Sequence, residues 1–349
     1  MSREPLKVAV IGCGYVSQTG HIPAALSAKN VKLVALCDLN EEVVKNSARK
    51  FKVNRYYVDP KQMFANEKLD AVDICTPIDT HMPVAIQAME AGCHVFTEKP
   101  LAGNLEDADK MIVAAKKYKV RLSVMQNQLF LPTIIKTKSI VDRGIIGDVV
   151  RVESKQDCPP QDYFMVADPN HWWHKLPGGV FGDGLPHPIY LLRHFISDLE
   201  PMAVFPRKLG NLEHLKYDEV QIILEGKRGV GAISVSCNST SLNALDIYGT
   251  KGNIHCDICN SYLIKYEGKT RSGMGIASLY ARQNLERSFQ IIGNTFSTGI
   301  KLLQGKHRGL PNAVHAFYES IQNGTEPPVT AEDGREVLRI LEIITSQMK

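Results

Sequence analysis

Residues 7–26 read "KVAVIGCGYVSQTGHIPAAL", and this stretch decides the fold of the first part of the chain. A short β-branched apolar run is followed by glycines at positions 12 and 14, and a helical pattern begins at about Val16. A glycine-rich turn between a strand and a helix is typical of a dinucleotide-binding βαβ unit, in which main-chain amides hold a pyrophosphate. Ser17 replaces the third glycine of the G-x-G-x-x-G pattern. Because that position only limits side-chain bulk where helix meets sheet, we expect serine to be tolerated there.

Asp38 supports the same interpretation from the end of the second apolar run, "LVALCD", 26 residues beyond Gly12. A carboxylate at this place can accept hydrogen bonds from the adenosine ribose hydroxyls and would repel a 2′-phosphate. No cation follows until Lys45, so the sequence favours NAD over NADP. The alternative is that Asp38 caps the helix expected from Glu41.

The order of the predicted elements indicates two domains of the α/β class. Strand-like runs alternate with helical patterns up to about residue 125, which predicts a parallel sheet covered on both faces. Beyond Asn127, consecutive strand-like runs are joined by the turns "EGKRG" and "GTKGN", which predicts a mainly antiparallel sheet, and a helical pattern ends the chain. We therefore expect a dinucleotide-binding domain over residues 1–125 and an α+β domain over residues 126–349.

Composition limits the remaining classes of function. Of 349 residues 44% are apolar, and the net charge of +4 comes from interspersed charges, which argues against a nucleic-acid partner. No apolar run is long enough to span a bilayer and no signal-peptide pattern is present, so we expect a cytoplasmic protein with reduced cysteines. The lone C-x-x-C of Cys256 and Cys259 lacks a second ligand pair, and we expect no metal site.

One segment carries an amphipathic stripe of apolar residues at helical spacing, formed by Leu285, Phe289, Ile292, Phe296, Ile300 and Leu303. The spacing predicts a helix. The simplest expectation is that its stripe packs on its own domain, while a subunit contact or a membrane-surface helix remain open.

Further motifs carry a resemblance to a known family. Glu98-Lys99-Pro100 follows a predicted strand, and "GGVFGDGLPHPIYLL" follows in the second domain. Together with the glycine-rich turn and Asp38, and with "CTPIDTH", "VMQNQLFLP", "GTKGNI" and "FYESIQNGTEPPVTAEDG", they resemble the glucose–fructose oxidoreductase/inositol dehydrogenase/MocA family over nearly the whole chain. The resemblance implies an N-terminal Rossmann domain and a C-terminal α/β domain with an open, mainly antiparallel sheet. It also implies an NAD(P)-dependent dehydrogenase acting on CH–OH groups of a sugar, sugar nucleotide or cyclitol.

The resemblance implies a catalytic set of Lys99, Asp183 and His187. Removal of hydride from a carbinol carbon needs a base for the hydroxyl proton, and a histidine suits that transfer at neutral pH. The Lys99 ammonium would stabilise alkoxide charge, and Asp183 would hold the substrate or position the base. A surface ion pair, a helix cap and a buried structural histidine, respectively, are the alternatives for the three.

Other positions are implied by the same resemblance. The cofactor would contact Gly12, Gly14, Tyr15, Val16, Asp38, Thr76, Pro77, His81, Glu98, Lys99 and Asn127. The substrate would contact Lys99, Trp173, His174, Asp183, His187 and Tyr190. Departures from the family pattern lie at Gln128 and Leu129, where many members carry arginine, and at Tyr190, where many carry aspartate. These departures bear on the identity of the substrate.

We therefore expect an NAD-dependent oxidoreductase with a small polyol or sugar substrate, no membrane span and a homo-oligomeric state, dimer or tetramer. Two alternatives stay open: a regulatory protein that senses nucleotide without turnover, and a hydrolase or epimerase that uses tightly bound NAD in an internal redox cycle.

Overall fold

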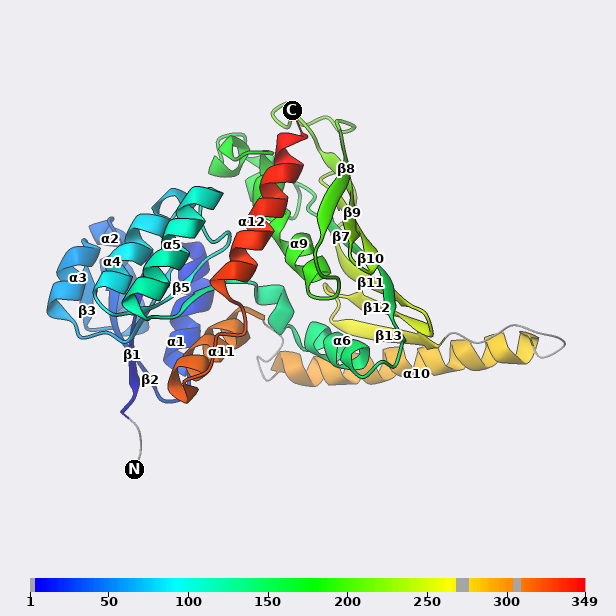
Figure 1. Ribbon diagram of the computed structural model, residues 1–349, viewed down its shortest axis with the longest axis horizontal. Helices are drawn as coiled ribbons and strands as arrows, with labels where there is room; N and C mark the ends of the chain where they lie inside the picture. The colour runs from blue at the N-terminus through cyan, green and yellow to red at the C-terminus, as the bar shows by residue number, and fades with distance from the viewer. Residues whose placement is uncertain (1–3, 268–275, 304–308, 349) are drawn as a thin grey trace. The chain divides into compact units, whose positions relative to one another are not determined.

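The computed structural model describes residues 4–267, 276–303 and 309–348 of the chain (Figure 1). The chain divides into two compact units. Unit 1 comprises Met1–Phe130 and Gly309–Arg339, and unit 2 comprises Leu131–Arg308 and Ile340–Lys349.

In its described part, unit 1 is built on a six-stranded sheet with the order β3-β2-β1-β4-β5-β6. All of its strand pairs are parallel. The order reverses between β1 and β4, which is the arrangement of a doubly wound nucleotide-binding sheet and confirms the predicted Rossmann domain. The strands are β1 (Leu6–Ile11), β2 (Val31–Cys37), β3 (Arg55–Tyr57), β4 (Ala71–Ile74), β5 (His94–Thr97) and β6 (Leu122–Val124).

The helices of unit 1 follow from local signals in the sequence. Asn40 and Asn104 cap the helices α2 (Glu41–Phe51) and α5 (Leu105–Tyr118), because each side-chain oxygen accepts a main-chain N–H of the first turn. Asn40 therefore fills the capping position of α2, which was the alternative considered for Asp38. The helical elements are η1 (Ser17–His21, one π-helical turn), α1 (Ile22–Ser27), α2 (Glu41–Phe51), α3 (Pro60–Asn66), η2 (Ile78–Thr80), α4 (His81–Glu90), α5 (Leu105–Tyr118), η3 (Asn127–Phe130) and α11 (Gly309–Asn323).

Helix α11 joins unit 1 although it lies far along the chain. Its Phe317 stacks on Phe96 of β5 with ring centroids 5.0 Å apart, within a buried apolar cluster that also includes Val8 and Val314. The compact units therefore differ from the expected ranges 1–125 and 126–349. Residues 309–339 pack with the parallel sheet, and the division falls inside α12 (Ala331–Ser346).

Unit 2 contains a seven-stranded sheet with the order β13-β12-β11-β7-β10-β9-β8 in its described part. Among the described pairs β7–β10 is parallel and the others are antiparallel, which confirms the predicted, mainly antiparallel sheet. The strands are β7 (Val149–Asp157), β8 (Glu200–Arg207), β9 (Glu219–Gly226), β10 (Gly229–Ser236), β11 (Leu242–Gly249), β12 (Gly252–Asp257) and β13 (Tyr262–Glu267). The helical elements are α6 (Pro132–Asp142), α7 (Phe164–Ala167), η4 (Trp172–Lys175), α8 (Val180–Gly184), α9 (Pro186–Arg193) and α10 (Ile276–Leu303).

The predicted amphipathic helix forms, as α10, but its apolar stripe does not pack on its own domain as expected. Phe289 is 72% exposed and Phe296 71% exposed, and Leu285, Ile292 and Ile300 are exposed as well. The side chain of Leu303 lies outside the described part.

Helix α10 instead presents a polar face to the sheet. The Gln290 amide accepts a hydrogen bond from the Lys265 N–H at 2.8 Å and donates one to the Lys265 carbonyl oxygen at 3.2 Å. Asn294 donates to the Leu263 carbonyl oxygen at 2.6 Å. These amides bond main-chain groups of the edge strand β13. Because those N–H and C=O groups need hydrogen-bond partners, the polar face of the helix turns inward.

In the described ranges, no helix combines the length and the apolar character needed to cross a membrane. All eight cysteines carry free thiols.

Candidate functional site

The glycine-rich turn leaves β1 at the carboxyl edge of the parallel sheet. Gly12 has a φ of +91°, and a Cβ added there would lie 2.5 Å from the Cys75 carbonyl oxygen, so only glycine fits. A Cβ at Gly14 would meet no atom within 4 Å, and the neighbouring Tyr15 and Val16 are exposed. The turn is therefore closely packed at its first glycine and open at its second. That is what a dinucleotide pyrophosphate would require.

Asp38 is tied directly to this turn. Its Oδ2 accepts a hydrogen bond from the Cys13 N–H at 2.7 Å, and its Oδ1 accepts one from the Asn40 N–H at 2.8 Å. Burial, together with the Asp38 charge, raises the pKa of the Cys13 thiol to about 12, so this thiol stays neutral. The carboxylate and the turn thus form one site at the ends of β1 and β2.

Ser17 begins the first helical turn and is buried, in keeping with a position where only a small side chain fits. Among the described residues, its hydroxyl oxygen has no hydrogen-bond partner.

The loops after β4 and β5 are joined by His81. Its Nε2 lies 2.9 Å from the Thr76 carbonyl oxygen and its Nδ1 lies 3.0 Å from the Pro100 carbonyl oxygen. Burial lowers the pKa of His81, so the ring is neutral and donates to one of these oxygens at a time. His81 was predicted to contact the cofactor, but it is buried beneath loops that carry Thr76 and Pro77 on one side and Lys99 on the other.

Glu98, Lys99 and Pro100 follow β5 at the same edge of the sheet. Glu98 Oε1 lies 2.9 Å from His21 Nε2, and Glu98 Oε2 accepts a hydrogen bond from the Lys99 N–H at 3.1 Å. Asn127 begins the short turn η3, after the neighbouring strand β6, and is half-buried.

Three polar residues that sequence reasoning missed complete this region. His21 Nδ1 lies 3.0 Å from Asp73 Oδ2, and the Tyr318 hydroxyl donates to Asp73 Oδ1 at 2.9 Å. All three side chains are buried. Each of the three is a polar residue within an otherwise apolar segment of the sequence. Because a buried polar or charged group needs a partner, that pattern could have indicated a buried polar cluster.

In unit 2, Asp183 lies in α8 and His187 in α9, with the helical residue Leu185 between them. Asp183 is buried, and His187 is half-buried with its Nδ1 2.7 Å from the hydroxyl oxygen of the buried Tyr190. The spacing of four along this helical path is that of side chains on one face. Tyr190, predicted as a substrate contact, is here the partner of the His187 ring.

The surroundings of Asp183 include a residue that the sequence did not single out. Burial raises the pKa of the Cys158 thiol to about 11, and the charges of Asp157 and Asp183 contribute to this shift. A neutral thiol therefore lies near the predicted substrate aspartate.

The tryptophan and histidine of the predicted substrate loop lie in η4. Trp172 is exposed and Trp173 half-buried. The His174 Nε2 lies 2.8 Å from the Asp168 carbonyl oxygen, and its ring meets that of His214 edge-on at 5.0 Å. The ring of His174 is thus occupied in holding its own loop. Among the described residues no group of three or more ligating side chains could hold a metal ion.

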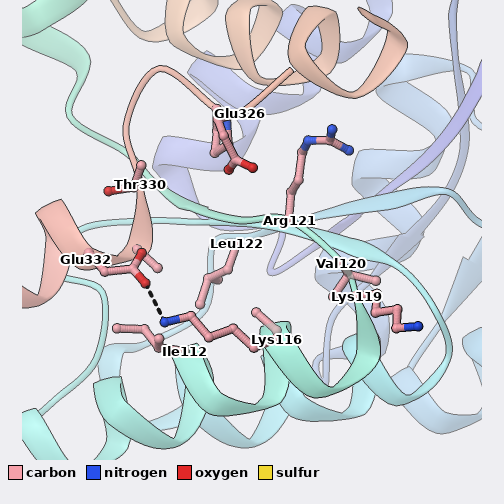
Figure 2. Close-up of a pocket in the computed structure, with 12 residues that line it drawn as sticks. Ile112, Lys116, Lys119, Val120, Arg121, Leu122, Glu326, Thr330 and Glu332 are labelled. Carbon is pink, nitrogen blue, oxygen red and sulfur yellow. Dashed lines mark ion pairs between the residues drawn. The ribbon is translucent and has the colours of Figure 1, made fainter. Parts of the chain in front are cut away.

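A pocket of about 360 Å³ in unit 1 is separate from these residues. Figure 2 shows the residues that line it. The pocket is lined by Arg121 and Leu122 at the amino end of β6, whereas the glycine-rich turn and Lys99 lie at carboxyl ends. Lys116 pairs with Glu332 at 2.9 Å, and the Arg121 Nε donates to the Thr325 carbonyl oxygen at 2.6 Å. Lys116 and Arg121 are therefore already engaged, and the pocket lies at the opposite edge of the sheet from the predicted site.

A glycine-rich turn bonded to an acidic strand end, on a doubly wound sheet, defines unit 1 as a dinucleotide-binding domain of the Rossmann class. Family models for the Gfo/Idh/MocA oxidoreductases match both parts of the chain: "Oxidoreductase family, NAD-binding Rossmann fold" over residues 6–126 and "Oxidoreductase family, C-terminal alpha/beta domain" over residues 138–349. The chain belongs to this family.

Relatives of known sequence or structure are similar over most of the chain. The myo-inositol 2-dehydrogenase of Thermotoga maritima is 25% identical, over 95% of this chain and 93% of its own. Oxidoreductase P35 of Formosa agariphila is 28% identical, over 79% and 85%. The crystal structure of the WlbA dehydrogenase from Bordetella pertussis, in complex with NADH and UDP-GlcNAcA, has a TM-score of 0.80 at 20% identity, covering 100% of this chain and 98% of that one. This last likeness concerns the fold.

Proposed function

We propose that the protein is an NAD-dependent dehydrogenase that oxidises a hydroxyl-bearing carbon of a sugar or cyclitol, or reduces the corresponding carbonyl. The observation that carries the proposal is the hydrogen bond from the Cys13 N–H to Asp38, which joins the nucleotide turn and the ribose-binding carboxylate in one site. Membership of an oxidoreductase family, with inositol and sugar dehydrogenases among the relatives, supports the substrate class.

The residues present fit NAD. The space at Gly14 would admit the pyrophosphate, and main-chain amides at the start of η1 would face it. Asp38 would accept ribose hydroxyls and repel a 2′-phosphate, and the nearest following cation, Lys45, is paired with Glu41 at 2.6 Å. When bound, NAD supplies the acceptor for the hydride that leaves the carbinol carbon.

The chain's own residues supply the proton chemistry. His187 would take the hydroxyl proton on its Nε2, and Tyr190 holds the ring by its Nδ1. The Lys99 ammonium would stabilise the negative charge that develops on the substrate oxygen, and Asp183 would orient the substrate through its other hydroxyls. The C–H electron pair leaves with the hydride and the O–H proton goes to His187, so the oxidation balances. In the reverse direction His187 returns the proton.

The test is the rate of NADH appearance at 340 nm across a panel of sugars and cyclitols, with NAD and NADP compared on each responding substrate. For that substrate, Lys99→Ala and His187→Ala should each lower kcat at least about 1,000-fold, since each removes a group that acts on the reacting oxygen. Both variants should leave NADH binding nearly intact. His315→Gln, on α11 of unit 1, is the control that should leave turnover unchanged. Full activity in both Lys99→Ala and His187→Ala would disprove the catalytic assignment of these two residues.

A further inference from the structure

His21 stands between two carboxylates in the interior of unit 1. Its Nδ1 lies 3.0 Å from Asp73 Oδ2 and its Nε2 lies 2.9 Å from Glu98 Oε1, and the His21 side chain is fully buried. Neither the nucleotide turn nor the proposed proton chemistry makes use of this ring.

Both ring nitrogens of His21 need a proton to satisfy this arrangement. An ionised carboxylate only accepts hydrogen bonds, so each nitrogen must donate, and an imidazole that donates twice is an imidazolium. Burial alone would lower the pKa of His21, but the interaction with Cys75 and the hydrogen bonds to Asp73 and Glu98 raise it well above its usual range. Burial alone would raise the pKa of Glu98, but the hydrogen bond and charge of His21 act together with Lys99 to outweigh it, and the net shift is downward.

Two further groups of this cluster, Tyr318 and Cys75, are neutral. Burial and the Asp73 charge raise the pKa of Tyr318 well above its usual range, so its hydroxyl stays protonated and donates to Asp73. Burial also raises the pKa of the Cys75 thiol. Among these neighbours the second cation is Lys99, whose ammonium further lowers the pKa of Glu98. Two carboxylates are thus balanced by His21 and Lys99, and removing either cation leaves a net buried negative charge.

The same ring connects three parts of the predicted site. His21 ends the helical turn η1 that follows the glycine-rich turn, and Asp73 lies in β4. Glu98 is fixed on one oxygen by His21 and on the other by the Lys99 N–H. Moving His21 would therefore remove one of the two anchors of the Glu98 carboxylate, next to the main chain that carries Lys99.

We propose that His21 is a positioning residue for Lys99: a buried imidazolium that keeps Glu98 ionised and holds the Glu98 side chain, next to Lys99, against the helical turn η1. The proposal rests on the proposed dehydrogenase function. His21 acts through Glu98 and touches neither the substrate nor the reacting atoms.

The kinetic test compares His21→Gln with His315→Gln, the same chemical change at a half-buried histidine of the same unit. In His21→Gln one of the two carboxylates should take up a proton near neutral pH, because the buried charge is no longer balanced. The ratio of wild-type to variant kcat should then be about 100 at pH 6 and fall to about 5 at pH 9, where that proton is lost again. Taking the ratio cancels pH effects that are common to both proteins. NADH affinity should change less than about threefold because the glycine-rich turn itself is intact.

Tyr318→Phe separates charge from packing. It removes a hydrogen bond to Asp73 and no charge, so its kcat ratio should be only about two to five and the same at every pH. A ratio for His21→Gln that is also the same at every pH, or a kcat equal to that of the wild type, overturns the positioning role.

A spectroscopic measurement that does not need His21→Gln covers the case in which that variant does not fold. The chain has 11 histidines, and His255 is a second one beside a carboxylate, with its Nδ1 2.6 Å from Asp246 Oδ1. In ¹⁵N spectra of a His255→Gln protein, one ring should keep both nitrogens protonated at a pH at which the other histidine rings are neutral. If every ring is neutral at that pH, the imidazolium is disproved. Failure of the wild type to oxidise any polyol would refute the dehydrogenase function alone, since the spectra still decide the charge of His21.

Discussion

Two buried serines of unit 1 differ in the hydrogen bonding of their hydroxyls. The Ser17 hydroxyl oxygen has no partner among the described residues, whereas the Ser123 hydroxyl donates to the Val329 carbonyl oxygen at 2.7 Å. Ser17→Ala should therefore leave the free energy of unfolding unchanged or raise it by up to about 1 kcal/mol. Ser123→Ala should lower it by about 1–2 kcal/mol, because a carbonyl oxygen then stays buried without its donor.

Urea unfolding of the two variants beside the wild type measures both changes. A loss of stability in Ser17→Ala as large as that in Ser123→Ala would mean that the Ser17 hydroxyl is bonded after all. NADH affinity of Ser17→Ala should stay within about threefold of the wild type, since the position only limits bulk.

At the residue scale, the sequence indicated the groups whose role is local and missed those whose role depends on distant partners. Gly12 and Asp38 could be recognised because the turn and the strand end that place them are short sequence patterns. His21 lies inside the same quoted stretch, but its partners stand 52 and 77 residues further along the chain. Nothing local distinguishes a histidine that joins two carboxylates from a histidine in an ordinary helix.

At the element scale, α10 separates what periodicity can predict from what it cannot. The repeat of apolar residues correctly predicted a helix, because side chains at this spacing share one face. It could not tell which face turns inward. The free main-chain groups of the edge strand β13 are met by Gln290 and Asn294, and hydrogen-bonding side chains are required there. The apolar stripe is left on the outside.

The Gln290 side chain should accordingly protect the edge of the sheet. In Gln290→Ala the Lys265 amide loses its acceptor, and its hydrogen-exchange rate should rise about tenfold or more. The matched control is Phe289→Ser, one residue away on the exposed face, which should leave that exchange rate within about twofold. Mass spectrometry of the β13 peptide measures the exchange. Equal exchange rates in the wild type and in Gln290→Ala would contradict this role.

At the scale of the whole molecule, the two sheet types and their order were predictable, and the membership of α11 was not. Alternation of strands and helices changes to consecutive strands once, near Asn127, and both sheets formed as expected. The return of residues 309–339 to unit 1 has no sequence signal of its own, since an apolar helical face does not state which sheet it will cover. Phe317 and Val314 complete the core that Phe96 begins.

The fragment of residues 1–130 should therefore not fold stably on its own. It keeps the sheet but lacks the aromatic rings of α11, and losing one buried phenylalanine alone costs about 3–5 kcal/mol. We expect no cooperative thermal transition from this fragment, and strong binding of a hydrophobic dye. A chimera in which residues 309–339 follow residue 130 through a flexible linker should recover a transition. A fragment that melts cooperatively at the temperature of the full chain would disprove the dependence.

The packing of α11 on a sheet made from the first residues also has a consequence for biosynthesis. The sheet leaves the ribosome early, but its covering helix is translated only after nearly all of unit 2. At roughly 5–20 residues per second, the residues between 130 and 339 take about 10 to 40 s to be made. During that interval Phe96 and its apolar neighbours have no α11 to cover them, and nascent-chain chaperones would have time to bind there. Substitutions in α11 should thus reduce the yield of soluble protein in cells more than their effect on the purified protein suggests.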